Sequence, residues 1–259
     1  MIGAIAGDII GSVYEWHPCK TKDFTPLFAP EAFFTDDTVL TVAVADALFK
    51  GRDPVATFKE WGWRYPDSGW GGMFAQWLFS DRTAPYGSFG NGAAMRVSPA
   101  GLLGKDLGEA REMAERVTRI THDHPEGIKG AIATVTAIVL ARQGTEAEVI
   151  RRAVQQDCGY DLDRTVEEIR PGYSFNETCQ STVPEAIICA LEATDYEDAV
   201  RNAISLGGDA DTLAAISGGI AEARFGIPPS IAREAFQRLP EDMQQVMEAL
   251  YARAGGAPW

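Results

Sequence analysis

Two short acidic clusters offer the clearest chemistry in this sequence. FTDDT at residues 34–38 precedes the apolar segment 39–49, and GGDADT at residues 207–212 precedes the apolar segment 213–220. Each cluster holds two carboxylates beside threonine hydroxyls, without a Lys or Arg among them. The pattern admits two interpretations, helix capping and metal binding.

Capping is the simpler interpretation, because Asp and Thr at a helix start accept hydrogen bonds from free N–H groups, each worth about 1 kcal/mol. One carboxylate suffices for a cap, however, and carboxylates packed in a dry place must be protonated, paired or bound to metal. Oxygen donors without Cys or His suit Mg²⁺ or Mn²⁺ rather than Zn²⁺. Two facing clusters can hold two ions about 3.5–4 Å apart, the spacing used in two-metal hydrolysis.

The elements that must position these clusters are helices. Alternation of apolar and polar residues is nearly absent, whereas helical periodicity is widespread. The predicted helices cover residues 38–49, 54–65, 107–121, 128–143, 146–156, 183–193, 196–205 and 212–225. No linker, charge block or change in composition marks a boundary. We therefore predict an all-α fold, with a single compact orthogonal helical domain over residues 1–259.

Glycine concentrates between the predicted helices, where it permits positive φ or close approach of the backbone to a ligand. Five segments rich in Gly, Asp, Asn and His are predicted to be loops, namely residues 3–11, 68–72, 87–92, 122–130 and 207–211. For any one of them, a plain connection between packed helices is an equally good explanation. Together they favour a ligand site built from loops.

The charge balance limits the possible partners. The chain has 259 residues with 23 basic and 37 acidic side chains, so its formal net charge is −14. Non-specific binding to nucleic acid or to an anionic membrane needs clustered Lys and Arg and is not expected. Residues 1–10 lack the basic start of a signal peptide, and no apolar stretch is long enough to cross a bilayer. Four cysteines without CxxC spacing are expected to be free thiols of a cytoplasmic protein.

The motifs together resemble those of the ADP-ribosylglycohydrolase family. They run in order along nearly the whole chain, with GAIAGDIIGSVYE at 3–15, FTDDT at 34–38, FGNGAAMRVSP at 89–99, THDHPEGIKGA at 121–131 and GGDADTLAAISGGIAEARFGIP at 207–228. The resemblance implies an all-α fold with a cleft that holds two Mg²⁺ or Mn²⁺ ions. It assigns the metal ligands to Thr35, Asp36, Asp37, Asp209, Asp211 and Thr212. Asp8, within the first motif, is expected to be structural or to support the ligands.

The reaction implied by the resemblance is hydrolysis of the glycosidic bond that joins C1″ of ADP-ribose to an acceptor. Cleavage develops oxocarbenium character at C1″, which nearby carboxylates stabilise. Glu15 falls on an acidic residue that the family places near its metals. Glu15, Asp36 or Asp37 can accept the proton of the attacking water, and the spacing does not select among these candidate catalytic residues. Bound metal would also mask the acidic site from an anionic substrate.

Two of the glycine-rich segments are then candidates for holding ADP-ribose. The backbone N–H groups of Gly90, Asn91 and Gly92 can bind a diphosphate or a ribose. The turn that contains Glu126 and Gly127 offers the same kind of donor.

Rings near these segments are further candidates for contact with substrate. His122 and His124 are two of the three histidines, and one is expected to contact ADP-ribose while the other is structural. No third nitrogen or sulfur ligand accompanies the pair to favour Zn²⁺. Tyr86 and Phe89 are the candidates for stacking on adenine.

The acceptor stays open at this stage. Relatives with this resemblance cleave linkages to arginine, serine, other groups and small molecules, so the expected partner is an ADP-ribosylated protein or a small-molecule conjugate of ADP-ribose. A monomer is favoured. Two rival functions are a di-metal hydrolase of another nucleotide sugar or phosphoester, and a non-catalytic ADP-ribose-binding protein. The intact set of six metal ligands argues against the second rival.

Overall fold

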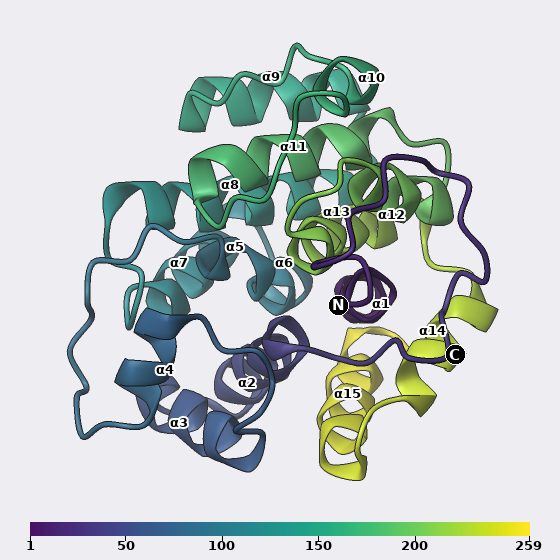
Figure 1. The fold of residues 1–259 in the computed structure, drawn as a ribbon. Coiled ribbons are helices and arrows are strands. Elements are labelled where there is room, and N and C mark those ends of the chain that lie inside the picture. Colours follow the sequence, from purple (N-terminus) through teal and green to yellow (C-terminus); the bar gives the residue numbers. More distant parts are fainter.

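Helices form the framework of the chain (Figure 1). The structure is a computed structural model that describes residues 1–253 and 255–259 with their side chains and Ala254 by its backbone alone. In chain order the helices are α1 (Ile2–Gly11), α2 (Asp36–Lys50), α3 (Pro54–Arg64), α4 (Gly72–Leu78), α5 (Gly92–Met95), α6 (Ser98–Leu103), α7 (Leu107–Thr118), α8 (Pro125–Arg142), α9 (Ala147–Cys158), α10 (Val166–Ile169), α11 (Cys179–Glu192), α12 (Tyr196–Ser205), α13 (Ala210–Phe225), α14 (Pro229–Gln237) and α15 (Glu241–Ala254). Across the described residues, β-structure is limited to one isolated bridge between Gly90 and Thr178. The predicted all-α fold is confirmed.

The core is centred on α13, which is buried from Ala210 to Ala221. Helices α1, α8, α11 and α12 pack against it, and Figure 1 shows α1 between α13 and the C-terminal helices α14 and α15. Buried apolar side chains form one continuous cluster from Met1 to Tyr251. This continuity supports the single domain over residues 1–259, which stays a prediction. No helix in the described part of the chain is long and apolar enough to cross a membrane.

The glycine-rich segment 3–11 is a helix rather than the predicted loop. Its glycines, spaced four residues apart, form the face of α1 that lies on α13. A Cβ added to Gly3 would lie 2.6 Å from the Gly218 carbonyl oxygen, and one added to Gly7 would lie 2.1 Å from the Ala214 oxygen. The prediction was wrong because spacing by four residues is also the pattern of closely packed helices.

Several other helix boundaries differ from the prediction in ways that affect the site. The predicted helix at 196–205 has the bounds of α12, whereas α2 and α13 each begin two residues earlier than predicted and take in acidic residues. The segment 122–130 is a loop only as far as His124, because Pro125 begins α8. Helices α1, α4, α5, α6, α10, α14 and α15 were not predicted.

Candidate active site

The starts of α2 and α13 meet at a cavity of about 330 Å³. The cavity wall also takes in residues 86–92 and part of the loop before α4. Of the predicted site residues, the wall includes Glu15, Asp36, Asp37, Gly90, Asn91, Gly92, His122, Asp209, Asp211 and Thr212. The two acidic clusters, far apart in the sequence, therefore face one space.

The first turn of α2 is held by a buried carboxylate of α1. Asp8 accepts hydrogen bonds from the backbone N–H groups of Thr35 at 3.0 Å and Thr38 at 3.2 Å, and from both threonine hydroxyls. Thr35 is the N-cap of α2, and its Oγ1 accepts from the N–H of Asp37 at 3.3 Å. Asp8 thus orients the turn that carries the first cluster, as a supporting residue would. It lies within a helix, not within a loop.

The second cluster is joined to the first by a hydroxyl. Thr212 Oγ1 donates to Asp37 Oδ2 at 3.2 Å, and the N–H of Thr212 donates to Asp211 Oδ1 at 3.0 Å. Asp209 stands at the N-cap of α13 but accepts no capping hydrogen bond through its side chain. Its Oδ2 accepts instead from Asn91 Nδ2 at 2.6 Å. The helix-capping interpretation therefore does not account for Asp209.

The carboxylates gather closely enough to share a cation. One oxygen from each of Asp8, Asp37 and Asp211 lies within 4.8 Å of the others, and the same holds for Glu15, Asp209 and Asp211. Among the described residues, no Lys, Arg or His forms an ion pair with any of them. Asp37 Oδ1 is buried without a hydrogen-bond partner. These oxygen donors fit a hard divalent cation.

Burial and mutual repulsion raise the pKa of Glu15 and of the aspartates in both acidic clusters. Burial, followed by neighbouring carboxylates, raises the pKa of Asp36, Asp37 and Asp211 well above its usual value. Burial raises the pKa of Asp209 to about 6 and that of Glu15 to about 7. So many acids cannot all ionise in one dry space unless positive charge joins them.

The glycine segment 90–92 forms a wall of the cavity, although its N–H groups are partly used within the protein. The N–H of Gly90 donates to Ser88 Oγ at 3.1 Å, and that of Asn91 donates to the Glu177 carbonyl at 2.7 Å. The Asn91 side chain donates a hydrogen bond to Asp209. Gly92 begins α5. Its N–H is therefore the better candidate of the three for a donor to substrate.

The two neighbouring histidines face different surroundings. His122 is buried at the cavity wall, and burial, followed by the charge of Arg96, lowers its pKa well below the usual value. His124 is the N-cap of α8, where its Nδ1 accepts from the N–H of Glu126 at 3.1 Å. His122 thus lies at the cavity, whereas His124 makes a structural contact at the start of α8.

The turn at the start of α8 lies outside the described cavity wall, which does not include His124, Glu126 or Gly127. Glu126 pairs with Lys129 at 3.2 Å. A Cβ on Gly127 would lie 2.8 Å from the Ser88 carbonyl oxygen, so this turn packs behind the wall. Contact of these three residues with substrate stays a prediction.

Aromatic rings and some residues without a clear sequence signal complete the wall. Tyr86 and Phe89 both line the cavity, and the Tyr86 ring lies 6.1 Å from that of His122. Glu177 was missed because it lies in a segment without periodicity and reaches the wall only through the bridge at Gly90. Arg96 was also missed, although a charge within the apolar run AAMRV was a visible signal.

Two curated relatives are similar to this chain over most of its length. Human ADP-ribosylhydrolase ARH3 is 26% identical over 329 aligned positions that cover 96% of this chain and 88% of the human protein. The ADP-ribosyl-[dinitrogen reductase] glycohydrolase of Rhodospirillum rubrum is 28% identical over 256 positions, with 85% of this chain and 80% of that protein covered.

A solved structure and a family model extend the likeness to the whole chain. The structure, described as an ADP-ribosylglycohydrolase-related protein complex, is similar with a TM-score of 0.72 at 25% identity, and the match covers 98% of this chain and 97% of that one. The model for ADP-ribosylglycohydrolase matches residues 1–258. Since this match spans nearly every residue, the chain belongs to the ADP-ribosylglycohydrolase family.

Proposed function

We propose that this chain is a metal-dependent hydrolase that cleaves the glycosidic bond between ADP-ribose and an acceptor. Membership of the family makes it a hydrolase of the ADP-ribose glycosidic bond. The metal dependence and the roles of individual residues are our proposal. One observation carries it, namely the group of buried carboxylates that share a cavity and have no cationic side chain among them.

The proposed metal ligands are the six residues Thr35, Asp36, Asp37, Asp209, Asp211 and Thr212. The free Oδ1 of Asp37 and the raised pKa values of the acids support this assignment. The assignment of Thr35 rests on the family motif, because Thr35 lies outside the described cavity wall and its hydroxyl donates to Asp8 at 2.7 Å. When bound, Mg²⁺ or Mn²⁺ neutralises these carboxylates and polarises the oxygens of water or of ribose hydroxyls.

The chain's own acids supply the remaining chemistry. Glu15 stands at the cavity wall beside Asp209 and Asp211, and its carboxyl can take up or release a proton near neutral pH. Asp36 and Asp37 line the same cavity and can act as the acid or base instead of Glu15. Negative charge here stabilises the oxocarbenium character that develops at C1″ as the bond breaks.

The other side of the cavity is proposed to hold the rest of ADP-ribose. Gly92 offers a backbone N–H and His122 a ring N–H, while Tyr86 and Phe89 offer faces for adenine. A volume of about 330 Å³ falls within the range of about 300–1,000 Å³ that is typical of small-molecule sites.

The proposed partner is an ADP-ribosylated protein or a small-molecule conjugate of ADP-ribose. The name of the human relative denotes ADP-ribose hydrolysis, and that of the Rhodospirillum rubrum relative denotes action on dinitrogen reductase. We propose that this chain acts as a cytoplasmic monomer. Its four cysteines are free in the structure.

Product analysis over a panel of substrates tests the proposal. Peptides ADP-ribosylated on arginine or serine, and O-acetyl-ADP-ribose, are incubated with the protein in Mg²⁺, Mn²⁺ or EDTA. We expect free ADP-ribose with an intact diphosphate, formed only with metal. Release of AMP would favour the rival phosphoester hydrolase. Binding of ADP-ribose without release of any acceptor would favour the non-catalytic rival.

A further inference from the structure

Arg96 is a buried cation without a carboxylate partner. It follows α5, its side chain has no exposed surface, and it contributes to the cavity wall. Within the described residues, its Nε and Nη1 have no hydrogen-bond partner, and its guanidinium lies 4.9 Å from the centre of the Phe58 ring. Burying a charge without a partner costs several kcal/mol, so an arginine here needs a reason beyond packing.

The shortest polar contact of Arg96 is to a hydroxyl. Arg96 Nη2 donates to Thr121 Oγ1 at 2.8 Å and, over a longer distance of 3.4 Å, to the Val117 carbonyl oxygen. A threonine oxygen accepts two hydrogen bonds and has a single proton to donate. Because Arg96 can only donate, the Thr121 proton is free for the Nδ1 atom of His122, which lies 2.8 Å away.

This arrangement selects one tautomer of His122. Nδ1 accepts a hydrogen bond from the Thr121 hydroxyl. Arg96 Nη2, which lies 3.4 Å away, points a second N–H toward the same nitrogen. A nitrogen that faces two donors is an acceptor, so the ring proton of the neutral imidazole sits on Nε2. Burial and the charge of Arg96 lower the pKa of His122 and keep the ring neutral.

The Nε2 atom faces the glycine wall of the cavity. A Cβ on Gly92 would lie 3.3 Å from Nε2, and one on Gly90 would lie 3.6 Å from it. Glycine at both positions therefore leaves space beside Nε2. An N–H in that space can donate to a ligand oxygen that lies against the loop.

We propose that Arg96 is a positioning residue, which acts through Thr121 to hold His122 as an Nε2–H donor to an oxygen of the bound ligand. The assignment of that ligand as ADP-ribose rests on the proposed function. The tautomer itself is a property of the free protein. The two can therefore be tested separately.

Nitrogen NMR of the ¹⁵N-histidine-labelled protein, without ligand, tests the tautomer directly. The chain has 3 histidines, so the spectrum is simple, and a His122→Asn variant assigns the signal of His122. We expect wild type and T121S to show Nε2–H, and T121V to lose most of this preference because Nδ1 then keeps only the more distant Arg96 donor at 3.4 Å. R96M should shift protonation toward Nδ1, since Thr121 Oγ1 becomes free to accept. His124, whose Nδ1 accepts from a backbone N–H, is the internal reference.

Calorimetric binding of ADP-ribose then tests the consequence. T121V and R96M should bind about tenfold more weakly than wild type, the size expected when one donor is lost, and T121S should restore affinity. If R96M does not fold, the T121V and T121S pair, which retains Arg96, decides the outcome. Unchanged His122 signals in T121V would overturn the proposal. A changed tautomer in a protein that never binds ADP-ribose would support the positioning role and contradict the proposed function.

Discussion

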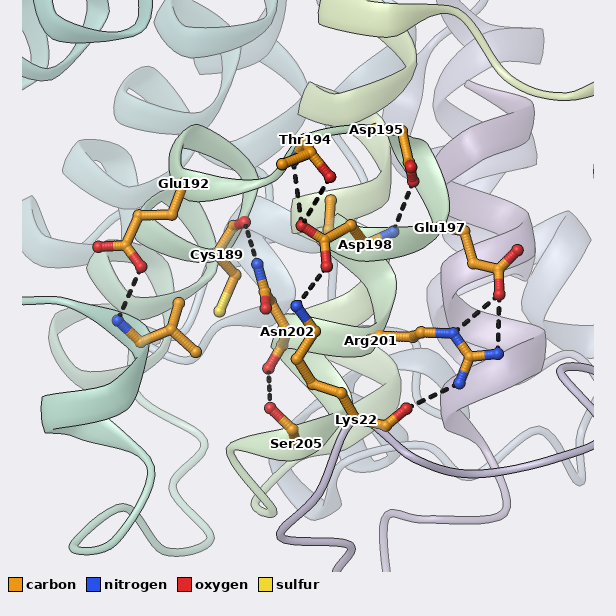
Figure 2. A network of polar contacts seen from close by, with 12 residues as sticks. Lys22, Cys189, Glu192, Thr194, Asp195, Glu197, Asp198, Arg201, Asn202 and Ser205 are labelled. Atoms are coloured by element: carbon orange, nitrogen blue, oxygen red, sulfur yellow. Dashed lines mark hydrogen bonds and ion pairs between the residues drawn. The ribbon is translucent and has the colours of Figure 1, made fainter.

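Helices α12 and α13 each begin with two aspartates, and the surroundings of the two pairs differ. Figure 2 shows the α12 pair, in which Asp195 caps the helix by accepting from the N–H of Asp198 at 2.9 Å. Asp198 in turn accepts from the N–H of Thr194 at 3.0 Å and pairs with Lys22. Every charge in this pair has a partner from the protein.

The α13 pair lacks such partners. Its N-cap, Asp209, makes no capping hydrogen bond through its side chain, and neither Asp209 nor Asp211 meets a cationic side chain among the described residues. Partial burial works to raise the pKa of Asp198, but hydrogen bonds and the charge of Lys22 lower it overall. The pKa values of Asp209 and Asp211 are raised. The opposite shifts of Asp198 and of the α13 pair distinguish an acid that the protein's own groups stabilise from acids that lack such partners, as the proposed metal site requires.

Loss of activity gives the largest predicted difference between the two pairs. Asp209→Asn and Asp36→Asn should each lower the rate of ADP-ribose release by about 100-fold or more, because even outer-shell changes at metal sites cost 10–100-fold. Asp198→Asn, the matched control at α12, should keep wild-type activity. The fold of each variant is checked by circular dichroism. Full activity of both D209N and D36N in saturating Mg²⁺ would remove the metal hypothesis.

The two pairs should also respond to pH in opposite directions. In the metal-free protein, burial raises the pKa of Asp209 to about 6 from its ordinary value of 3.8. The folded state therefore retains a proton that the unfolded chain releases, and stability falls as pH rises through this window, by about 3 kcal/mol in all for this residue and by about half of that between pH 5 and pH 8. The stabilisation from Asp198 is instead lost as pH falls through its lowered pKa. Urea unfolding in EDTA at pH 5 and pH 8 measures the first effect, which D209N should reduce. A metal-free protein that is more stable at pH 8 would contradict it.

Metal should stabilise the fold through the α13 pair and not through the α12 pair. Mg²⁺ at 100 times its dissociation constant should raise the free energy of unfolding by about 2.7 kcal/mol, because it binds the folded state. Thermal unfolding with Mg²⁺ and with EDTA measures the shift. D198N should retain the response and Asp211→Asn should lose most of it. An equal response in both variants would place the metal elsewhere.

The smallest predicted effect belongs to the structural pair. Asp195→Ala removes the N-cap of α12 and should destabilise the protein by about 1 kcal/mol, with no change in the rate of hydrolysis. Chemical denaturation and the ADP-ribose release assay measure the two quantities. A large loss of activity in this variant would mean that the α12 pair also serves the site.

The sequence was sufficient to predict helix bounds and site residues that are encoded in local motifs. The bounds of α12 and the meeting of the two acidic clusters both follow from motifs that can be read along the chain. Contacts that depend on packing could not be predicted. His122 and His124 stand two residues apart, and only the start of α8 at Pro125 decides which one faces the cavity. Glu177 enters the wall through a pairing with residues far away in the sequence.

The packing of α1 on α13 has a consequence for biosynthesis. Gly3 and Gly7 find their partner surface only in α13, and the Met1 amino group pairs with Glu222, 221 positions away. While the ribosome makes the chain, Asp36 and Asp37 appear early but the second acidic cluster appears late. The apolar face of α1 stays exposed until α13 has been synthesised. Contacts between residues so far apart in the sequence also form slowly. The proposed catalytic centre is therefore among the last parts of the nascent protein to assemble, and a chain that is truncated before Gly207 lacks the second acidic cluster.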